Sequence, residues 1–215
     1  MNNSIFISKS SDEVAELNQF CKEKGFYLIA ESMIQFEAVP FKIENSYDVL
    51  FFASIRAAEF FLKQEKIPST VSIACIGQTT AEKLIKLGLS VDFIGEQSGN
   101  PEKVADAFNL WLGPRNVLIP QSTLSKRSIA SKTTPKQCFE VVVYATISAC
   151  KIIPKCATYI FTSPSNFNSF LKCNETPHGK IIAWGETTRK EILKNGINAD
   201  YTLINSNLAE LYSLL

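Results

Sequence analysis

The chain has 215 residues, of which 46% are hydrophobic and 20% are charged, and its formal net charge is +1. This length accommodates one large domain or two domains of roughly 100 residues each, and the composition is typical of a globular protein. The near-neutral charge excludes a global field that would attract nucleic acid or an acidic membrane, so we expect neither as a partner.

The sequence also argues against membrane insertion and export. No apolar run approaches the ~20 residues that are needed to cross a bilayer. The segment Met1–Ser10 lacks the basic-then-apolar pattern of a signal peptide. We therefore expect a cytoplasmic protein.

Six cysteines are scattered along the chain without a C-x-x-C pair, namely Cys21, Cys75, Cys138, Cys150, Cys156 and Cys173. We interpret them as buried thiols in a reducing compartment. The only histidine, His178, lies in a loop-like stretch beside Gly179. One histidine without clustered cysteines argues against a metal site, and it leaves a serine or cysteine nucleophile without the base that activates it.

The predicted elements begin with a strand at Ile5–Ser8 and a helix, followed by a strand-rich stretch at Met33–Phe41. A second strand-rich stretch lies at Phe139–Ile147. Elsewhere, short apolar runs are each followed by small polar residues and a helical pattern, at Val49–Phe52, Ile73–Ile76, Val117–Pro120, Tyr159–Phe161 and Ile181–Trp184. Continuous apolar runs that alternate with helices indicate buried parallel strands.

The helix boundaries are marked by capping and termination residues. Three segments fit a capping box, in which side chains satisfy free amides at the helix start: Ser10-x-x-Glu13, Thr79-x-x-Glu82 and Thr188-x-x-Glu191. Pro101 and Pro164 suit the first helical turn behind Asn100 and Ser163 as caps. Three glycines follow the last periodic residue of a helix, where a left-handed termination favours them: Gly25, Gly88 and Gly196.

Two stretches of the chain resemble two others at an offset of about half the length. Asp48–Lys63 aligns with Ala157–Lys172, and Val71–Phe93 aligns with Gly179–Tyr201. The matched pairs include Ser54/Ser163, Gly77/Gly185, Thr79/Thr187, Thr80/Thr188, Gly88/Gly196 and Asp92/Asp200. We interpret the pattern as a duplicated module.

The repeat predicts two α/β domains. Residues 1–32 and 148–215 are expected to form one discontinuous domain, and residues 42–138 the other. The stretches 33–41 and 139–147 then serve as two linker strands, paired with each other. Such a double linker sets up a cleft and a hinge, where ligands commonly bind.

The candidate chemistry lies in the loops that follow the predicted parallel strands, because ligands bind at the carboxyl ends of such strands. Each loop leads into a helix N-terminus, which holds anions through free amides and the helix dipole. Lys9 and Arg56 lie in these loops and add charge-assisted contacts. The alternative is that the serines and threonines only cap helices. Lys126 and Arg127 are weaker candidates, since such residues usually belong to a solvated face.

Tyr144 lies in the second predicted linker strand, after Val141–Val143. The simpler interpretation is ordinary strand packing. The functional alternative is a phenol at the mouth of the cleft that donates a proton or a hydrogen bond.

The order of these motifs resembles the uroporphyrinogen-III synthase family over nearly the whole chain. The motifs are a strand with Ser54, a strand followed by Gly77-x-Thr79-Thr80-Ala81, the strand Leu118-Ile119-Pro120, Val143-Tyr144-x-Thr146, then Ser163-Pro164-Ser165 and Gly185-x-Thr187-Thr188. The resemblance implies two flavodoxin-like parallel-sheet domains joined by a two-strand β-ladder. It also implies hydroxymethylbilane as the substrate, with no cofactor and no metal.

The resemblance further implies which residues act. Tyr144 corresponds to the family's tyrosine and is the expected catalytic residue. The substrate-binding residues are expected to be Lys9, Ser54, Arg56, Gly77, Thr79, Thr80, Ser163, Gly185, Thr187 and Thr188. The implied partner is the enzyme that makes the substrate, hydroxymethylbilane synthase, in a transient contact, and the chain is expected to be a monomer.

The implied reaction starts with loss of the terminal hydroxyl of the linear tetrapyrrole as water. The resulting cationic azafulvene attacks ring D at its substituted carbon, and the spiro intermediate fragments and recloses with ring D inverted. The substrate also cyclises unaided, without inversion. The protein's main task is therefore to fold the substrate so that the substituted carbon of ring D is the carbon nearest to the azafulvene.

Two alternatives remain open at this point. One is a cytoplasmic two-domain module that binds or senses a small anion without catalysis. The other is an enzyme that binds a phosphosugar or a nucleotide through the same loops, although neither glycine-rich phosphate-binding motif occurs in the sequence.

Overall fold

The computed structural model describes residues 3–96 and 100–215. The chain divides into two compact units, each made of a parallel sheet and its helices. Unit 1 comprises Met1–Gln35 and Ile147–Leu215, and unit 2 comprises Phe36–Thr146.

Unit 1 is built on a five-stranded sheet in the order β11-β10-β9-β1-β2, and all of its strand pairs are parallel. The strands are β1 (Ser4–Ile7), β2 (Tyr27–Ala30), β9 (Thr158–Phe161), β10 (Lys180–Ala183) and β11 (Tyr201–Thr202). Numbered by their appearance within the unit, the strands follow the order 2-1-3-4-5 of flavodoxin-like folds. This arrangement confirms the predicted buried parallel strands.

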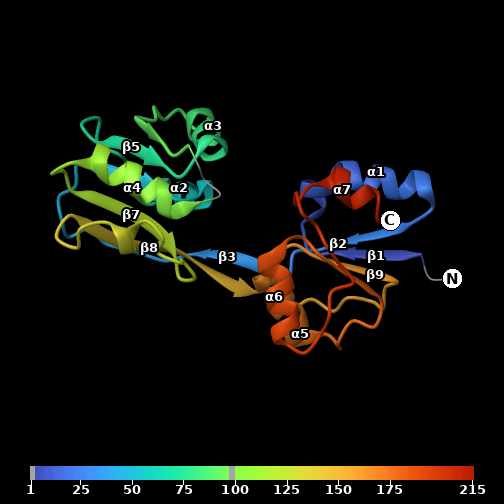
Figure 1. Ribbon diagram of the computed structural model, residues 1–215. Coiled ribbons are helices and arrows are strands. Elements are labelled where there is room, and N and C mark those ends of the chain that lie inside the picture. The colour runs from blue at the N-terminus through green and yellow to red at the C-terminus, as the bar shows by residue number, and fades with distance from the viewer. Residues whose placement is uncertain (1–2, 97–99) are drawn as a thin grey trace. The chain divides into compact units, whose positions relative to one another are not determined.

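The helices of unit 1 cover both faces of this sheet (Figure 1). They are α1 (Ala15–Lys24), α5 (Pro164–Cys173), α6 (Glu186–Lys194) and α7 (Leu208–Tyr212), and a 3-10 turn at Ser11–Val14 precedes α1. Alternate strand residues point to opposite faces, so Phe6 and Phe161 pack under α5 and α6, whereas Ile7 and Ile160 pack under α1 and α7. The continuous apolar strands of the sequence therefore serve two cores at once.

Unit 2 is built on a six-stranded sheet in the order β3-β8-β7-β4-β5-β6. Its strands are β3 (Ile34–Ala38), β4 (Val49–Phe52), β5 (Ser72–Cys75), β6 (Phe93–Ile94), β7 (Val117–Ser122) and β8 (Cys138–Ser148). The helices are α2 (Ile55–Leu62), α3 (Gln78–Lys86) and α4 (Pro101–Leu112), with a 3-10 turn at Ala130–Lys132. The core clusters place α2 and α3 on one face and α4 on the other.

Strand β3 lies beside β8 at one edge of the unit 2 sheet. Val39 N–H donates to the Val143 carbonyl at 3.0 Å, and Ala149 N–H donates to the Met33 carbonyl at 2.8 Å. Because the residue numbers rise along one strand while they fall along the other, the two strands run antiparallel. On its other side β8 pairs with β7 in parallel, with a register shift between Gln121 and Ser122.

The internal repeat is confirmed in the structure. Helices α3 and α6 begin and end at residues that are 108 positions apart, as Gln78–Lys86 and Glu186–Lys194 show. The matched aspartates also do the same work: the Asp92 carboxylate accepts from Ile73 N–H and the Asp200 carboxylate from Ile181 N–H, both at 2.7 Å. Asp92 thereby connects the loop before the edge strand β6 to the neighbouring strand β5, and Asp200 connects the loop before β11 to β10.

Most of the predicted helix ends are confirmed, but two capping boxes are wrong. Gly25, Gly88 and Gly196 have positive φ angles at helix ends, and the Glu13 carboxylate accepts from both the backbone N–H and the hydroxyl of Ser10. Thr79 and Thr188, however, lie inside the first turns of α3 and α6, whose N-caps are Gly77 and Gly185. These helices begin before the threonines because the glycine carbonyls already accept the first helical hydrogen bonds.

The prediction of six free thiols is also wrong. Cys150 and Cys173 form a disulfide with their Cα atoms 5.5 Å apart. The other four cysteines are thiols, and Cys138 alone among them is not fully buried. No motif marks the pair, because the fold brings the segment after β8 to the end of α5.

Candidate substrate-binding loops and a tyrosine

The loop serines of the two units lie at matched helix starts. Ser54 is the N-cap of α2, where its Oγ accepts from Ala57 N–H at 3.2 Å. Ser163 is the N-cap of α5, where its Oγ accepts from Asn166 N–H at 3.2 Å and from the Asn166 side chain at 3.0 Å. Both serines therefore cap helices, as the simpler interpretation expected. A hydroxyl that accepts hydrogen bonds in this way still has its own proton to donate.

The two glycine loops expose backbone amides at the starts of α3 and α6. The carbonyls of Gly77 and Gly185 accept the first helical hydrogen bonds, but a glycine has no side chain to cap the amides that follow. Two residues follow each glycine, Gln78 and Thr79 in α3 and Glu186 and Thr187 in α6. Within residues 3–96 and 100–215, their backbone N–H groups have no hydrogen-bond partner. Helix N-termini of this kind attract anions through free amides and the helix dipole.

The threonines of these loops differ in accessibility. Thr79 and Thr187 are exposed, Thr80 is half-buried, and Thr188 is buried with 4% of its surface exposed. Thr79 and Thr187 are thus open to solvent at the helix starts, whereas Thr188 contributes mainly to packing.

The two helix starts also differ in charge. Glu186, the first residue of α6, forms two hydrogen bonds of 2.7 Å with the guanidinium of Arg189, and this contact lowers the pKa of the Glu186 carboxyl below its usual value. Gln78 holds the matched position in α3 and donates to Glu82. The α3 start therefore carries no charged side chain of its own, while the α6 start carries an ion pair.

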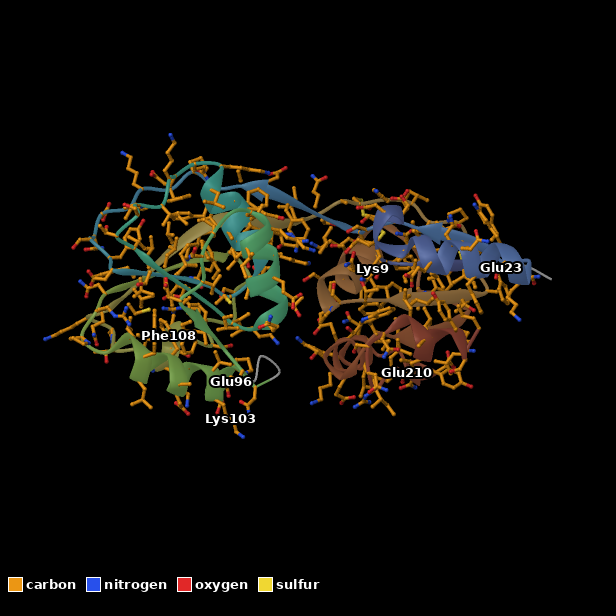
Figure 2. All side chains as sticks on the ribbon, turned by 90° about the horizontal axis from the view of Figure 1, so that it is seen from above. Lys9, Glu23, Glu96, Lys103, Phe108 and Glu210 are labelled. Carbon is orange, nitrogen blue, oxygen red and sulfur yellow. A yellow bond between two sulfur atoms is a disulfide. The ribbon has the colours of Figure 1, made fainter. Side chains whose placement is uncertain are left out.

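Lys9 lies at the carboxyl end of β1, at the opposite end of unit 1 from Glu23 (Figure 2). Its ammonium nitrogen is 5.3 Å from the centre of the Trp184 ring, and Trp184 directly precedes Gly185. The structure thus brings Lys9 to the glycine loop of unit 1, as the strand order predicts.

Arg56 and Tyr144 belong to one aromatic cluster in unit 2. The Tyr144 ring stacks on Phe60 with centroids 5.2 Å apart and meets the edge of Phe36 at 5.9 Å. The guanidinium of Arg56 lies 3.5 Å from the centre of the Phe36 ring. Two predicted site residues from different elements, α2 and β8, therefore contact the same phenylalanine.

The Tyr144 side chain is largely buried, with 8% of the residue exposed, yet its hydroxyl lacks a hydrogen-bond partner in the described part of the chain. Only Asn109 Oδ1 and Ser148 Oγ are fully enclosed without a partner among the described side chains, so the Tyr144 oxygen reaches the surface. A fixed ring with a free, accessible phenol is suited to donating a hydrogen bond or a proton to a ligand.

Arg127, which the sequence assigns to a solvated face, lies over a cavity at the carboxyl edge of the unit 2 sheet. This cavity has a volume of about 350 Å³ and extends to Ala53 after β4 and Ile76 after β5. Arg127 forms an ion pair with Glu140 of β8, which also accepts from Gln121 at 2.9 Å. No sequence signal points to this cluster, because its members meet only through the pairing of β7 with β8.

The charge of Glu140 also affects the nearest thiol. Burial, with a further contribution from the Glu140 carboxylate, raises the pKa of Cys138 to about 11, although Arg127 opposes the shift. Cys138 is therefore a protonated thiol at neutral pH and a poor nucleophile.

Another cavity, of about 500 Å³, lies at the other edge of the unit 1 sheet, beside Ala157 and Gly179, which precede β9 and β10. Ligands of parallel sheets bind at the carboxyl edge, so its position separates it from the predicted site residues. Within the described residues, no group of three or more histidine, cysteine, aspartate or glutamate side chains is placed to hold a metal ion. In the same part of the chain, no helix is both long and apolar enough to cross a membrane.

Comparison with known proteins gives a family match and two informative structures. The family model described as uroporphyrinogen-III synthase HemD matches residues 15–211. The chain is similar to the crystal structure of uroporphyrinogen-III synthetase from Helicobacter pylori, with 18% identity, a TM-score of 0.73, and coverage of 100% of this chain and 98% of that one. It is also similar to a mutant uroporphyrinogen III synthase from Thermus thermophilus, with 11% identity, a TM-score of 0.62, and coverage of 98% and 96%.

No curated protein matches the sequence. At these identities the two structures support the fold, and the family model supplies the assignment because it covers most of the chain. The chain belongs to the uroporphyrinogen-III synthase family, whose members cyclise hydroxymethylbilane to uroporphyrinogen III.

Proposed function

We propose that this chain inverts ring D with Tyr144 as the group that assists departure of the substrate's hydroxyl and with the loops of each unit as carboxylate-binding sites. The overall reaction, cyclisation of hydroxymethylbilane with loss of water, rests on the family match over residues 15–211. The assignment of roles to residues rests on the geometry of the loops and of Tyr144.

The free phenol of Tyr144 carries the catalytic proposal. Its ring is fixed between Phe60 and Phe36, while its hydroxyl has no partner in the described chain. Hydrogen bonding from this hydroxyl to the leaving oxygen of the substrate stabilises the charge that develops as the carbon–oxygen bond breaks. The oxygen leaves as water, and the azafulvene cation remains to attack ring D.

The binding proposal assigns the substrate carboxylates to the helix starts and their neighbours. The free amides behind Gly77 and Gly185, with the accessible hydroxyls of Thr79 and Thr187, provide donors for carboxylate oxygens. Further donors from the predicted set are Lys9, Ser54, Arg56, Thr80 and Ser163, whereas Thr188 supports the unit 1 loop from inside. Backbone donors of this kind bind a polyanion without a large net positive charge on the protein.

Holding the carboxylates also explains the inverted product. Unaided cyclisation joins the nearest free carbon of ring D, so the protein must favour the substituted carbon by fixing the conformation of the chain. We further propose that the chain acts as a cytoplasmic monomer and receives its unstable substrate in a transient contact with hydroxymethylbilane synthase. Sedimentation of the chain alone tests the monomer, and sedimentation with that enzyme tests the contact.

Tyr144→Phe tests the catalytic role, because a phenyl ring retains the packing against Phe60 and loses only the hydroxyl. We expect the rate of type III uroporphyrinogen formation to fall by about 10- to 1,000-fold, at or below the lower part of the range of about 100- to 10,000-fold for general acid catalysis. Tyr27→Phe is the matched control, since Tyr27 lies on β2 with 70% of its surface exposed. An unchanged rate for Tyr144→Phe, with both variants folded, would remove the phenol from the mechanism.

A further inference from the structure

Arg127 is held over the unit 2 cavity by the carboxylate of Glu140, which contacts one edge of its guanidinium group. Its Nε lies 2.9 Å and 3.0 Å from the two oxygens of Glu140, and one of its terminal nitrogens pairs with the same carboxylate. Gln121 donates to Glu140 from the neighbouring strand, since Glu140 lies opposite Ile119 in the β7–β8 register. The remaining terminal nitrogen has no partner in the described chain, and 63% of the side chain is exposed.

The backbone at Arg127 is also unusual. Its φ angle is 54°, in the left-handed region that a residue with a side chain rarely adopts. Ser125 Oγ accepts from Arg127 N–H at 3.1 Å, and Ser131 N–H donates to the Arg127 carbonyl at 2.8 Å. A strained conformation that neighbouring groups maintain is often part of a functional site, because it fixes the direction of the side chain.

The cavity beneath Arg127 combines an apolar interior with a positive rim. Its apolar lining is formed mainly by Ile76, Ile119, Ile129 and Ala130. The lining includes the two cations Lys126 and Arg127, and among the described lining residues there is no carboxylate. An apolar ring that carries an acidic substituent suits such a cavity, because the ring fills the interior while the acid meets the cations.

We propose that Arg127 binds a carboxylate of the substrate and that the cavity beneath it receives the pyrrole ring bearing this carboxylate. Glu140 and Gln121 are then positioning residues, which hold the guanidinium with one terminal nitrogen free for the ligand. The proposal rests on the proposed function for the identity of the ligand, and it adds an anchor that no sequence motif marks.

The competing interpretation is that the pair of Arg127 and Glu140 only ties the segment after β7 to β8. An ion pair with this much exposure contributes little to stability. A purely structural role therefore predicts no selective change in substrate affinity, whereas a binding role predicts a change in KM with little change in kcat.

Arg127→Gln tests the proposal, with Lys86→Gln as the control that removes one positive charge from the exposed end of α3. We expect Arg127→Gln to raise the KM for hydroxymethylbilane about tenfold, or about 1.4 kcal/mol, and to change kcat by less than about threefold. Arg127→Lys, which retains the charge but not the planar fork, should raise KM less. Lys86→Gln should leave both constants unchanged.

A KM for Arg127→Gln within twofold of the wild-type value would overturn the proposal, as would an equal rise in Lys86→Gln, which would indicate a long-range field. If Arg127→Gln does not fold, an unchanged KM for Arg127→Lys has the same meaning. Calorimetric titration with uroporphyrinogen III separates this failure from failure of the proposed function. If the wild-type chain forms only the type I isomer, the proposed function is wrong. If uroporphyrinogen III binds the wild type more tightly than Arg127→Gln, Arg127 binds a carboxylate of the ligand whether or not the chain turns over substrate.

Discussion

Ser54 and Ser163 illustrate how one hydroxyl serves both fold and function. Each accepts a backbone N–H at the start of its helix, and this contact typically stabilises a protein by about 1 kcal/mol. The hydroxyl proton remains free to bond to a carboxylate, so the capping and binding roles do not compete. A substitution that keeps the acceptor and removes the donor separates the two roles.

Ser54→Asp is such a substitution, because aspartate is as good an N-cap as serine but repels a carboxylate. We expect the free energy of unfolding in urea to change by less than about 0.5 kcal/mol, while the KM for hydroxymethylbilane rises at least about tenfold. Ser54→Asn, which retains both a cap and a donor, should stay close to the wild type in both measurements. An unchanged KM in Ser54→Asp would assign Ser54 to capping alone.

Contacts between residues close in sequence are predictable from the sequence alone. Capping by Ser163 and Asn100 depends on neighbours within one helical turn, and both caps are confirmed. The disulfide of Cys150 with Cys173 and the contact of Arg127 with Glu140 depend on which strands and helices meet in space. No periodicity or spacing in the sequence reports those encounters.

Among the helices, α3 and α6 begin a few residues earlier than the sequence predicts, with N-caps at Gly77 and Gly185 in place of Thr79 and Thr188. Several polar residues follow one another there, and each of Gly77, Thr79 and Thr80 has the composition of a cap. The backbone decides, because Gly77 and Gly185 are extended and their carbonyls accept the first helical bonds. These glycine caps support the proposed function, since a glycine cap leaves more amides free than a threonine cap does.

Gln78→Pro tests the contribution of one such amide. Proline is well accommodated at the first helical position, as Pro101 and Pro164 show in α4 and α5, and the extended Gly77 before it is compatible with a following proline. We expect the variant to keep its thermal stability while KM rises about three- to tenfold, the effect of one lost hydrogen bond. Gln78→Ala, which keeps the N–H, is the control, and equal KM values for the two variants would contradict amide binding.

At the scale of the whole molecule, the duplication predicted from matched glycines, threonines and aspartates corresponds to two related sheets. Strands β2-β1-β9-β10-β11 of unit 1 match β8-β7-β4-β5-β6 of unit 2 in order, although the chain enters the two sheets at different strands. The sequence reveals the matched core because Asp92 and Asp200, or Gly77 and Gly185, hold the same positions in both. The sequence predicts a linker strand at 139–147 but does not reveal that this strand, β8, also pairs in parallel with β7, because the partner of a strand is set by the tertiary fold.

The most direct test of ring D inversion by this chain is the isomer composition of the product that it forms from freshly prepared hydroxymethylbilane. Chromatography of the oxidised products separates the type III isomer, which requires inversion of ring D, from the type I isomer of spontaneous closure. We predict that the type III fraction rises towards completeness as the concentration of the chain increases, because binding then outpaces unaided cyclisation. A product that remains type I at every concentration of a folded chain would contradict this prediction.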